Sequence, residues 1–219
     1  MTQKHALLIG ATGLVGSHLL KRLLDDERFA SVTVLGRRTA GLQHPKLTEH
    51  IIDFSKPEAW APLVQGDVLY LCLGTTRAKA GSKQAQYEVD YSYQFNMATV
   101  AVKNGVGSVV LVSSAGARHT SPFFYMRMKG ELERDLSTLP FRHKVFIRPG
   151  PLTGPRSEDR RAENLGVAVI STINRLGLMK KYKPIHGDTV ALAMINATFI
   201  QAQDKHIFEY SEVFRLAGV

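Results

Sequence analysis

The chain is poor in the features that mark secreted and membrane-spanning proteins. It has one cysteine, Cys72, among 219 residues, so no disulfide can form within the chain, and this fits a reducing compartment. No apolar run approaches the roughly 20 residues that cross a bilayer. The apolar run near the N-terminus is short and breaks into a glycine loop, unlike a signal peptide. We therefore expect a cytoplasmic protein without a membrane segment.

Several catalytic and binding signatures are also missing. The eight histidines show no metal-site spacing such as His-x-x-x-His, so we expect no metal. The paired serines Ser113 and Ser114 lack the Gly-x-Ser-x-Gly elbow of a hydrolase. Neither a zinc-finger spacing nor an RNA-binding aromatic motif is present.

Basic residues outnumber acidic ones, and they are unevenly placed. The net charge is +9, and residues 118–183 alone hold 14 Lys and Arg against 6 Asp and Glu. A basic surface favours polyanions or anionic small molecules. With no nucleic-acid motif in the chain, we favour a solvated face plus a phosphate-bearing cofactor over nucleic-acid binding.

Apolar strands alternate with helical segments along the chain. Hydrophobic residues make up 44% of it, enough for a sizeable core. The alternation predicts an α/β fold of Rossmann type, a doubly wound parallel sheet with helices on both faces. We expect one domain over 1–219, with small substrate-side elements at 154–186 and 205–219. Strands are expected to begin at residues 5, 31, 47, 67, 108, 143 and 206, and helices to span 17–26, 84–104, 122–137, 159–176, 188–203 and 211–218.

The segment GATGLVG, residues 10–16, follows the first expected strand and opens the first helix. Glycine permits a tight turn and lets the backbone approach a pyrophosphate, while the helix N-terminus offers its N–H groups to the anion. A plain strand-to-helix turn is the alternative. The position at the start of an alternating β/α chain favours a dinucleotide site.

The second expected strand ends in Gly36-Arg37-Arg38. A site for NAD usually carries an acid here, which accepts from the ribose 2′-hydroxyl, but residues 36–40 contain none. Two guanidinium groups can instead pair with a 2′-phosphate. This favours NADP over NAD, against the alternative of a solvated loop.

Tyr125 precedes Lys129 by four residues in FFYMRMKGE, so both side chains lie on one helix face. Alone, this spacing is common on amphipathic helices. Ser113 and Ser114, however, end a strand at the carboxyl edge that the glycine loop also borders. An ammonium moves a phenol pKa toward neutral, and a serine hydroxyl can hold a carbonyl oxygen. These residues are therefore candidates for hydride-transfer chemistry.

Together the motifs resemble a known family. The segments GATGLVG, IIDFS with Asp53, the two serines, Tyr125-x-x-x-Lys129 and FIRPGPLTGPR are similar to atypical short-chain dehydrogenases/reductases. The segments GRR, CLGTTRAKAGS, SSAGA and YMRMKGELE most resemble the Tat-interacting-protein-like NAD(P)H-binding oxidoreductases and uncharacterised bacterial relatives. The likeness covers nearly the whole chain.

The resemblance implies NADP(H), with NAD(H) less favoured, and a small carbonyl or alcohol substrate. Tyr125 would be the acid/base, Lys129 would touch the nicotinamide ribose and lower the phenol pKa, and Ser114, in preference to Ser113, would orient the substrate. The helices at 84–104 and 122–137 would be the faces of a homodimer. The residues predicted at the cofactor are Gly10, Thr12, Gly13, Leu14, Val15, Gly16, Arg37, Arg38, Asp53, Phe54, Leu73, Gly74, Thr75, Ser113, Tyr125, Lys129, Arg148, Pro149, Gly150, Pro151 and Leu152.

One departure and three readings remain open. Many extended members carry Val-Asn where this chain has Val89-Asp90, which puts an asparagine-dependent proton relay in doubt. Arg156, Arg160 and Arg161 indicate an anionic substrate group, with a solvated helix start as an equal alternative. Beside the oxidoreductase stand an NADP(H)-binding regulator that docks a protein partner and a nucleotide-sugar epimerase or dehydratase. The short substrate region argues against the last.

Overall fold

The computed structural model describes residues 2–154, 183–200 and 206–219. The helix predicted at 159–176, most of the expected substrate element at 154–186, and the three arginines Arg156, Arg160 and Arg161 fall outside these residues. Within them, no helix is both long and apolar enough to pass through a membrane.

Seven parallel strands form one sheet in the order β3-β2-β1-β4-β5-β6-β9. The chain winds outward from β1 in one direction and from β4 in the other, which is the doubly wound Rossmann arrangement predicted. The strands are β1 Lys4–Ile9, β2 Phe29–Gly36, β3 Leu47–Ile51, β4 Val68–Leu71, β5 Ser108–Val112, β6 His143–Arg148 and β9 His206–Glu209. A separate parallel pair joins β7 Leu152–Thr153 to β8 Ile185–His186.

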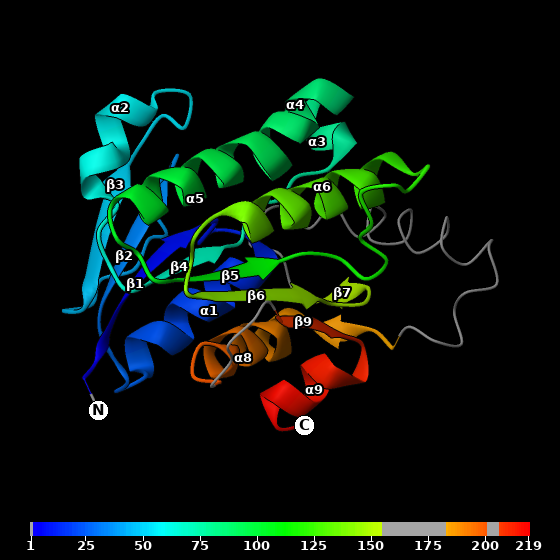
Figure 1. Cartoon of the computed structure of the whole chain (residues 1–219). Helices are drawn as coiled ribbons and strands as arrows, with labels where there is room; N and C mark the ends of the chain where they lie inside the picture. Colours follow the sequence, from blue (N-terminus) through cyan, green and yellow to red (C-terminus); the bar gives the residue numbers. More distant parts are fainter. Residues whose placement is uncertain (1, 155–182, 201–205) are drawn as a thin grey trace.

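Helices cover both faces of the sheet (Figure 1). The pleat explains how one strand serves both layers, because neighbouring side chains point to opposite faces. In β1, Leu8 belongs to the core under α1 and α8, whereas Leu7 and Ile9 belong to the core under α5 and α6. One face carries α1 Leu14–Asp25, α8 Gly187–Ala197 and α9 Ser211–Ala217, and the other carries α2 Pro57–Trp60, α5 Tyr93–Lys103 and α6 Phe124–Thr138.

The helix predicted at 84–104 is not uniform. It consists of α4 Lys83–Tyr87, a π-helical segment Glu88–Ser92 and then α5. Such π segments are frequent at functional sites. The loop at 74–83, read from its composition as small and polar, contains the short helix α3 Arg77–Ala80, whose first turn is capped by the Thr76 hydroxyl.

Candidate functional site

The glycine loop has a geometry that only glycine allows. Gly10 has φ +85°, and a Cβ there would lie 2.4 Å from the carbonyl carbon of Cys72 in the neighbouring strand's loop. A Cβ at Gly16 would lie 2.1 Å from the Gly10 oxygen. No side chain caps the N-terminus of α1, and no acid lies in its first turn. This helix end is therefore open to an anion.

Two arginines flank this loop from the end of β2. The Nε and Nη2 atoms of Arg38 each lie 3.4 Å from the Thr12 hydroxyl oxygen, so the guanidinium reaches across the loop. Arg37 is exposed. Burial and then Glu88 raise the pKa of the Tyr93 phenol, and the charge of Arg37 opposes this rise. The structure thus brings Arg38 to the glycine loop and Arg37 within electrostatic reach of Tyr93.

The predicted pair Asp53 and Phe54 divides into an exposed and a buried residue. The Asp53 carboxylate is exposed and accepts from the N–H and hydroxyl of Ser55, which holds the carboxyl pKa below its ordinary value. Phe54 is buried and stacks on Tyr93, with ring centroids 5.3 Å apart. Tyr93 was not among the predicted residues. Its contact arises across about forty residues of chain, which local spacing cannot show.

Tyr125 and Lys129 lie one turn apart near the start of α6, as predicted. Tyr125 keeps 38% of its surface exposed. Several neighbouring groups nevertheless change the pKa of its phenol. Burial raises that pKa most; Lys129 and a hydrogen bond with Ser114 oppose the rise, and Asp90 adds to it. The net direction is upward. The expected shift toward neutral pH is therefore not found, because burial outweighs the lysine charge and a nearby acid opposes that charge.

The opposing charge is Asp90, the residue at which the sequence departs from the extended members of the family that it resembles. Asp90 lies in the π-helical segment, and its Oδ1 is 3.5 Å from the Lys129 Nζ. Its Oδ2 accepts from the Thr75 N–H at 2.8 Å. Burial lowers the pKa of Lys129, but Asp90 and Tyr125 more than offset this, and the net shift is upward. The ammonium therefore stays charged at neutral pH.

The two serines after β5 occupy different surroundings. The Ser113 hydroxyl is buried, and it finds no hydrogen-bond partner within the described part of the chain. A buried unsatisfied hydroxyl costs roughly 1–3 kcal/mol, so an incoming polar group would be stabilised there. Ser114 is only partly buried, and its hydroxyl acts on the Tyr125 phenol. Ser114 is thus the serine placed toward the tyrosine.

The segments that follow β4 and β6 lie at the same carboxyl edge of the sheet as the two serines. Leu73, Gly74 and Thr75 follow β4, and the Thr75 backbone is tied to Asp90. The backbone N–H of Ala115 donates to the Pro149 oxygen at 3.0 Å, so the segment after β6 lies beside the segment after β5. The predicted stretch Pro149–Leu152 therefore borders the serines.

Arg148 has a structural task. Its Nε donates to Glu133 Oε1 at 2.9 Å, and its Nη1 pairs with Glu209. These bonds connect β6 to α6 and β9, and they raise the guanidinium pKa above its ordinary value. The predicted contact of Arg148 with the cofactor is left to its backbone, because two carboxylates hold the side chain.

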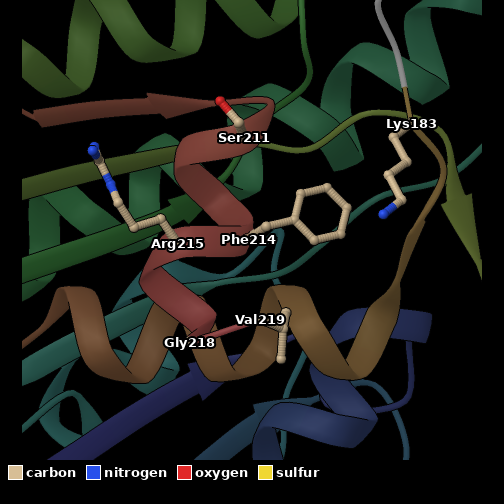
Figure 2. Close-up of a pocket in the computed structure, with 6 residues that line it drawn as sticks. All are labelled: Lys183, Ser211, Phe214, Arg215, Gly218 and Val219. Carbon is tan, nitrogen blue, oxygen red and sulfur yellow. The ribbon is translucent and has the colours of Figure 1, made fainter.

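A cavity of about 550 Å³ lies elsewhere, beside α9. Lys183, Phe214 and Arg215 are among its lining residues, and the Lys183 Nζ lies 5.3 Å from the Phe214 ring centroid. Figure 2 shows Phe214 turned toward Lys183 while Arg215 extends from another side of the helix. Since α9 and α6 cover opposite faces of the sheet, this cavity is separate from the edge at Tyr125. Within the described residues, no group of three or more His, Cys, Asp and Glu is placed to hold a metal ion.

Comparison with protein families now identifies the chain. Residues 10–175 match the family described as NAD(P)H-binding. The chain belongs to this NAD(P)H-binding family. The match begins at Gly10, the first residue of the glycine loop.

Curated relatives refine this assignment and correct two expectations. The chain is 41% identical to the mitochondrial protein fmp52 of Aspergillus fumigatus over 96% of this chain and 93% of that protein. It is 37% identical to FMP52 of Candida albicans over 86% of this chain and 85% of that protein. The close relatives found are thus FMP52 proteins, and not the Tat-interacting or bacterial type that the segments suggested. The expectation was wrong because it rested on short motifs, and short motifs do not distinguish one group of related proteins from another.

The expected cytoplasmic location is contradicted. Curated relatives from four fungi are named as mitochondrial proteins. The expectation rested on one cysteine and on a start unlike a signal peptide. Neither feature distinguishes one reducing compartment from another.

Solved structures of low sequence identity confirm the fold. UDP-glucose 4-epimerase from Thermotoga maritima, solved with UDP-glucose, has a TM-score of 0.71 and 12% identity over 97% of this chain and 81% of that chain. The Thermus thermophilus UDP-glucose 4-epimerase complex with NAD has a TM-score of 0.69 and 18% identity over 98% and 81%. At this identity the likeness shows the Rossmann-like architecture alone.

The position of Arg148 gives a testable consequence for stability. Arg148→Met leaves the buried Glu133 without its cation, and breaking such a pair typically costs roughly 3–5 kcal/mol. We expect a lower urea midpoint by circular dichroism and unchanged NAD(P)H affinity in the folded protein. The double variant Arg148→Met/Glu133→Gln should recover part of the loss. Weaker nucleotide binding with unchanged stability would instead place the guanidinium at the cofactor.

Proposed function

We propose that the protein is an NADP(H)-dependent oxidoreductase that moves a hydride between the nicotinamide and a small carbonyl or alcohol. Ser114, Tyr125 and Lys129 are the catalytic set. The observation that carries the proposal is the placement of Ser114 just after β5 and of Tyr125 and Lys129 one turn apart near the start of α6, where Ser114 and Lys129 both act on the Tyr125 pKa. Membership of the NAD(P)H-binding family supports it as well.

The features around the glycine loop fit this cofactor. The uncapped N-terminus of α1 suits a pyrophosphate, and the close contacts of Gly10 and Gly16 leave the loop backbone bare of side chains. Arg37 and Arg38 suit a 2′-phosphate, in the place where an acid would favour NAD. The unsatisfied Ser113 hydroxyl offers one more polar contact. In this proposal residues 1–219 act as one nucleotide-binding unit.

The chain's residues divide the chemistry between them. When bound, dihydronicotinamide supplies a hydride to the carbonyl carbon. Ser114 holds the carbonyl oxygen, and Tyr125 donates its phenolic proton to that oxygen as negative charge develops there. The alcohol leaves, and water reprotonates the Tyr125 phenolate. Lys129 keeps a positive charge near the phenol while this proton moves.

A regulator that binds NADP(H) and docks a protein partner is the alternative from another class. Both readings require nucleotide binding, and they differ in turnover. Steady oxidation of NADPH with members of a carbonyl panel supports the enzyme. Tight NADPH binding without any turnover, together with a specific partner, supports the regulator.

The arginines after β2 test the choice of cofactor. Arg37→Ala/Arg38→Ala removes charge-assisted contacts, each typically worth about 1.5–3 kcal/mol, which corresponds to roughly ten- to a hundredfold in affinity. In calorimetric titrations, the affinity for NADPH should fall by this factor, while the affinity for NADH should change little. Arg28→Ala is the matched control, because Arg28 lies at the other end of β2 and pairs with Asp26. Equal losses for the two nucleotides would refute the NADP assignment.

The tyrosine tests the chemistry. Tyr125→Phe deletes one hydroxyl and should leave folding and NADPH affinity intact, while turnover falls by roughly 10²–10⁴-fold, as for a lost general acid. NADPH absorbance, followed with the carbonyl panel, measures this. Tyr87→Phe is the matched control, because the Tyr87 hydroxyl bonds Glu131 and takes no part in the proposed set. An active Tyr125→Phe variant would exclude Tyr125 as the proton donor.

Lys129→Ala should impair two properties at once, because it removes a predicted ribose contact and the charge beside the phenol. Lys129→Arg should rescue poorly, since a broad guanidinium does not replace a compact ammonium. Nucleotide titration and turnover are measured on the same samples. Full activity of Lys129→Arg would show that only the positive charge matters.

A further inference from the structure

Asp90 is a buried acid with no assigned task. It is 1% exposed, and Lys129, its partner, is 3% exposed. Removing two charges from water is costly unless they pair and form further hydrogen bonds. Asp90 meets this requirement with both oxygens, one facing Lys129 and the other accepting from the Thr75 N–H. It therefore ties α6 to the loop after β4.

The position of Asp90 follows from the π-helical segment that interrupts α4 and α5. This segment directs Asp90 into the interior, while Glu88 of the same segment stays exposed. Gln94, one turn on, donates to the Asp90 backbone oxygen at 2.6 Å and fixes the turn. Because Asp90 is shielded from water, its carboxylate depends on Lys129 and the Thr75 N–H for stabilisation.

The charged and titratable groups around the Tyr125–Lys129 pair can be named element by element. Tyr125, Lys129 and Glu133 come from α6, Asp90 from the π-helical segment and Cys72 from the segment just after β4. Glu133 is already paired with Arg148. Burial raises the pKa of the Cys72 thiol, which keeps it neutral. Lys129 and Asp90 thus remain as the pair of opposite charges that acts on the phenol.

We propose that Asp90 is a positioning residue, which holds the Lys129 ammonium in place and partly offsets its charge at the Tyr125 phenol. Burial and Asp90 together then keep Tyr125 a neutral phenol at rest, the proton donor that carbonyl reduction requires. Oxidation of an alcohol would need the phenolate instead. The inference rests on the proposed function and deepens it, because it assigns reduction as the direction for which the resting site is prepared.

Electrostatics gives the expected effect of removing Asp90. In Asp90→Asn the Tyr125–Lys129 pair loses the acid that pairs with Lys129, while the other nearby acid, Glu133, stays paired with Arg148. The pair then gives up its first proton at lower pH, as coupled groups do when a nearby charge is removed. An uncompensated ammonium nearby typically lowers an acid's pKa by roughly 1–3 units. The phenolate should therefore form at a pH lower by about that amount.

The test is an ultraviolet titration of phenolate, which needs neither substrate nor turnover. The Tyr125 signal is the difference between each protein and the same protein carrying Tyr125→Phe. Asp90→Asn should shift this signal by roughly 1–3 pH units downward. Asp90→Asn/Lys129→Met removes both charges and should titrate near the wild-type position. Glu88→Gln, which removes an exposed acid of the same segment, is the control and should shift nothing.

Each outcome decides the proposal. An unshifted Tyr125 signal in Asp90→Asn, or an equal shift in the double variant, would overturn it. If Asp90→Asn does not fold, isotope-labelled aspartate in the unaltered protein gives the answer by nuclear magnetic resonance. An ionised Asp90 carboxylate at neutral pH supports the proposal, and a protonated Asp90 overturns it. Failure of NADPH to bind would count against the proposed function, since these titrations are made without nucleotide.

Discussion

All strands of the large sheet run parallel, and this direction decides where chemistry can occur. Parallel strands begin at one edge and end at the other, so every segment that follows a strand leaves from the same edge. The glycine loop after β1, Arg37 and Arg38 after β2, and the serines after β5 meet there for that reason. The reversal of winding between β1 and β4 opens the space in which a ligand sits in folds of this kind.

Buried charges impose the second constraint. Lys129 belongs to α6 and Arg148 to β6, and each would be costly to bury without a partner. The structure gives Asp90 to Lys129 and Glu133 with Glu209 to Arg148. The two sets serve different ends. The first lies beside the proposed proton donor, and the second fastens β6 between α6 and β9. A single basic residue within a motif therefore says little about function until its partners are known.

Local sequence was enough to predict much of this arrangement. Strands, most helices and the Tyr125–Lys129 pair depend on hydrophobic periodicity and short spacing, and those signals are present within a few residues. Contacts between distant segments left no such signal. The stacking of Tyr93 on Phe54 and the bonds of Arg148 to Glu133 and Glu209 exist only after the sheet has formed.

Asp90 was only partly predictable from the sequence. The sequence marked it as a departure from related chains, which put an asparagine relay in doubt, but could not show what replaced it. That required the inward turn of the π-helical segment and the approach of α6. The upward direction of the Tyr125 pKa comes first from burial, and Asp90 adds to it by opposing the charge of Lys129.

The central claim is that nucleotide and proton donor meet at the edge of the sheet. A crystal structure of the protein with NADPH tests it most directly. The account predicts the pyrophosphate at the N-terminus of α1, the 2′-phosphate beside Arg37 and Arg38, and the nicotinamide C4 facing the Tyr125 hydroxyl with room for one carbonyl between them. A nicotinamide lying away from Tyr125, or a nucleotide bound elsewhere on the sheet, would contradict the account.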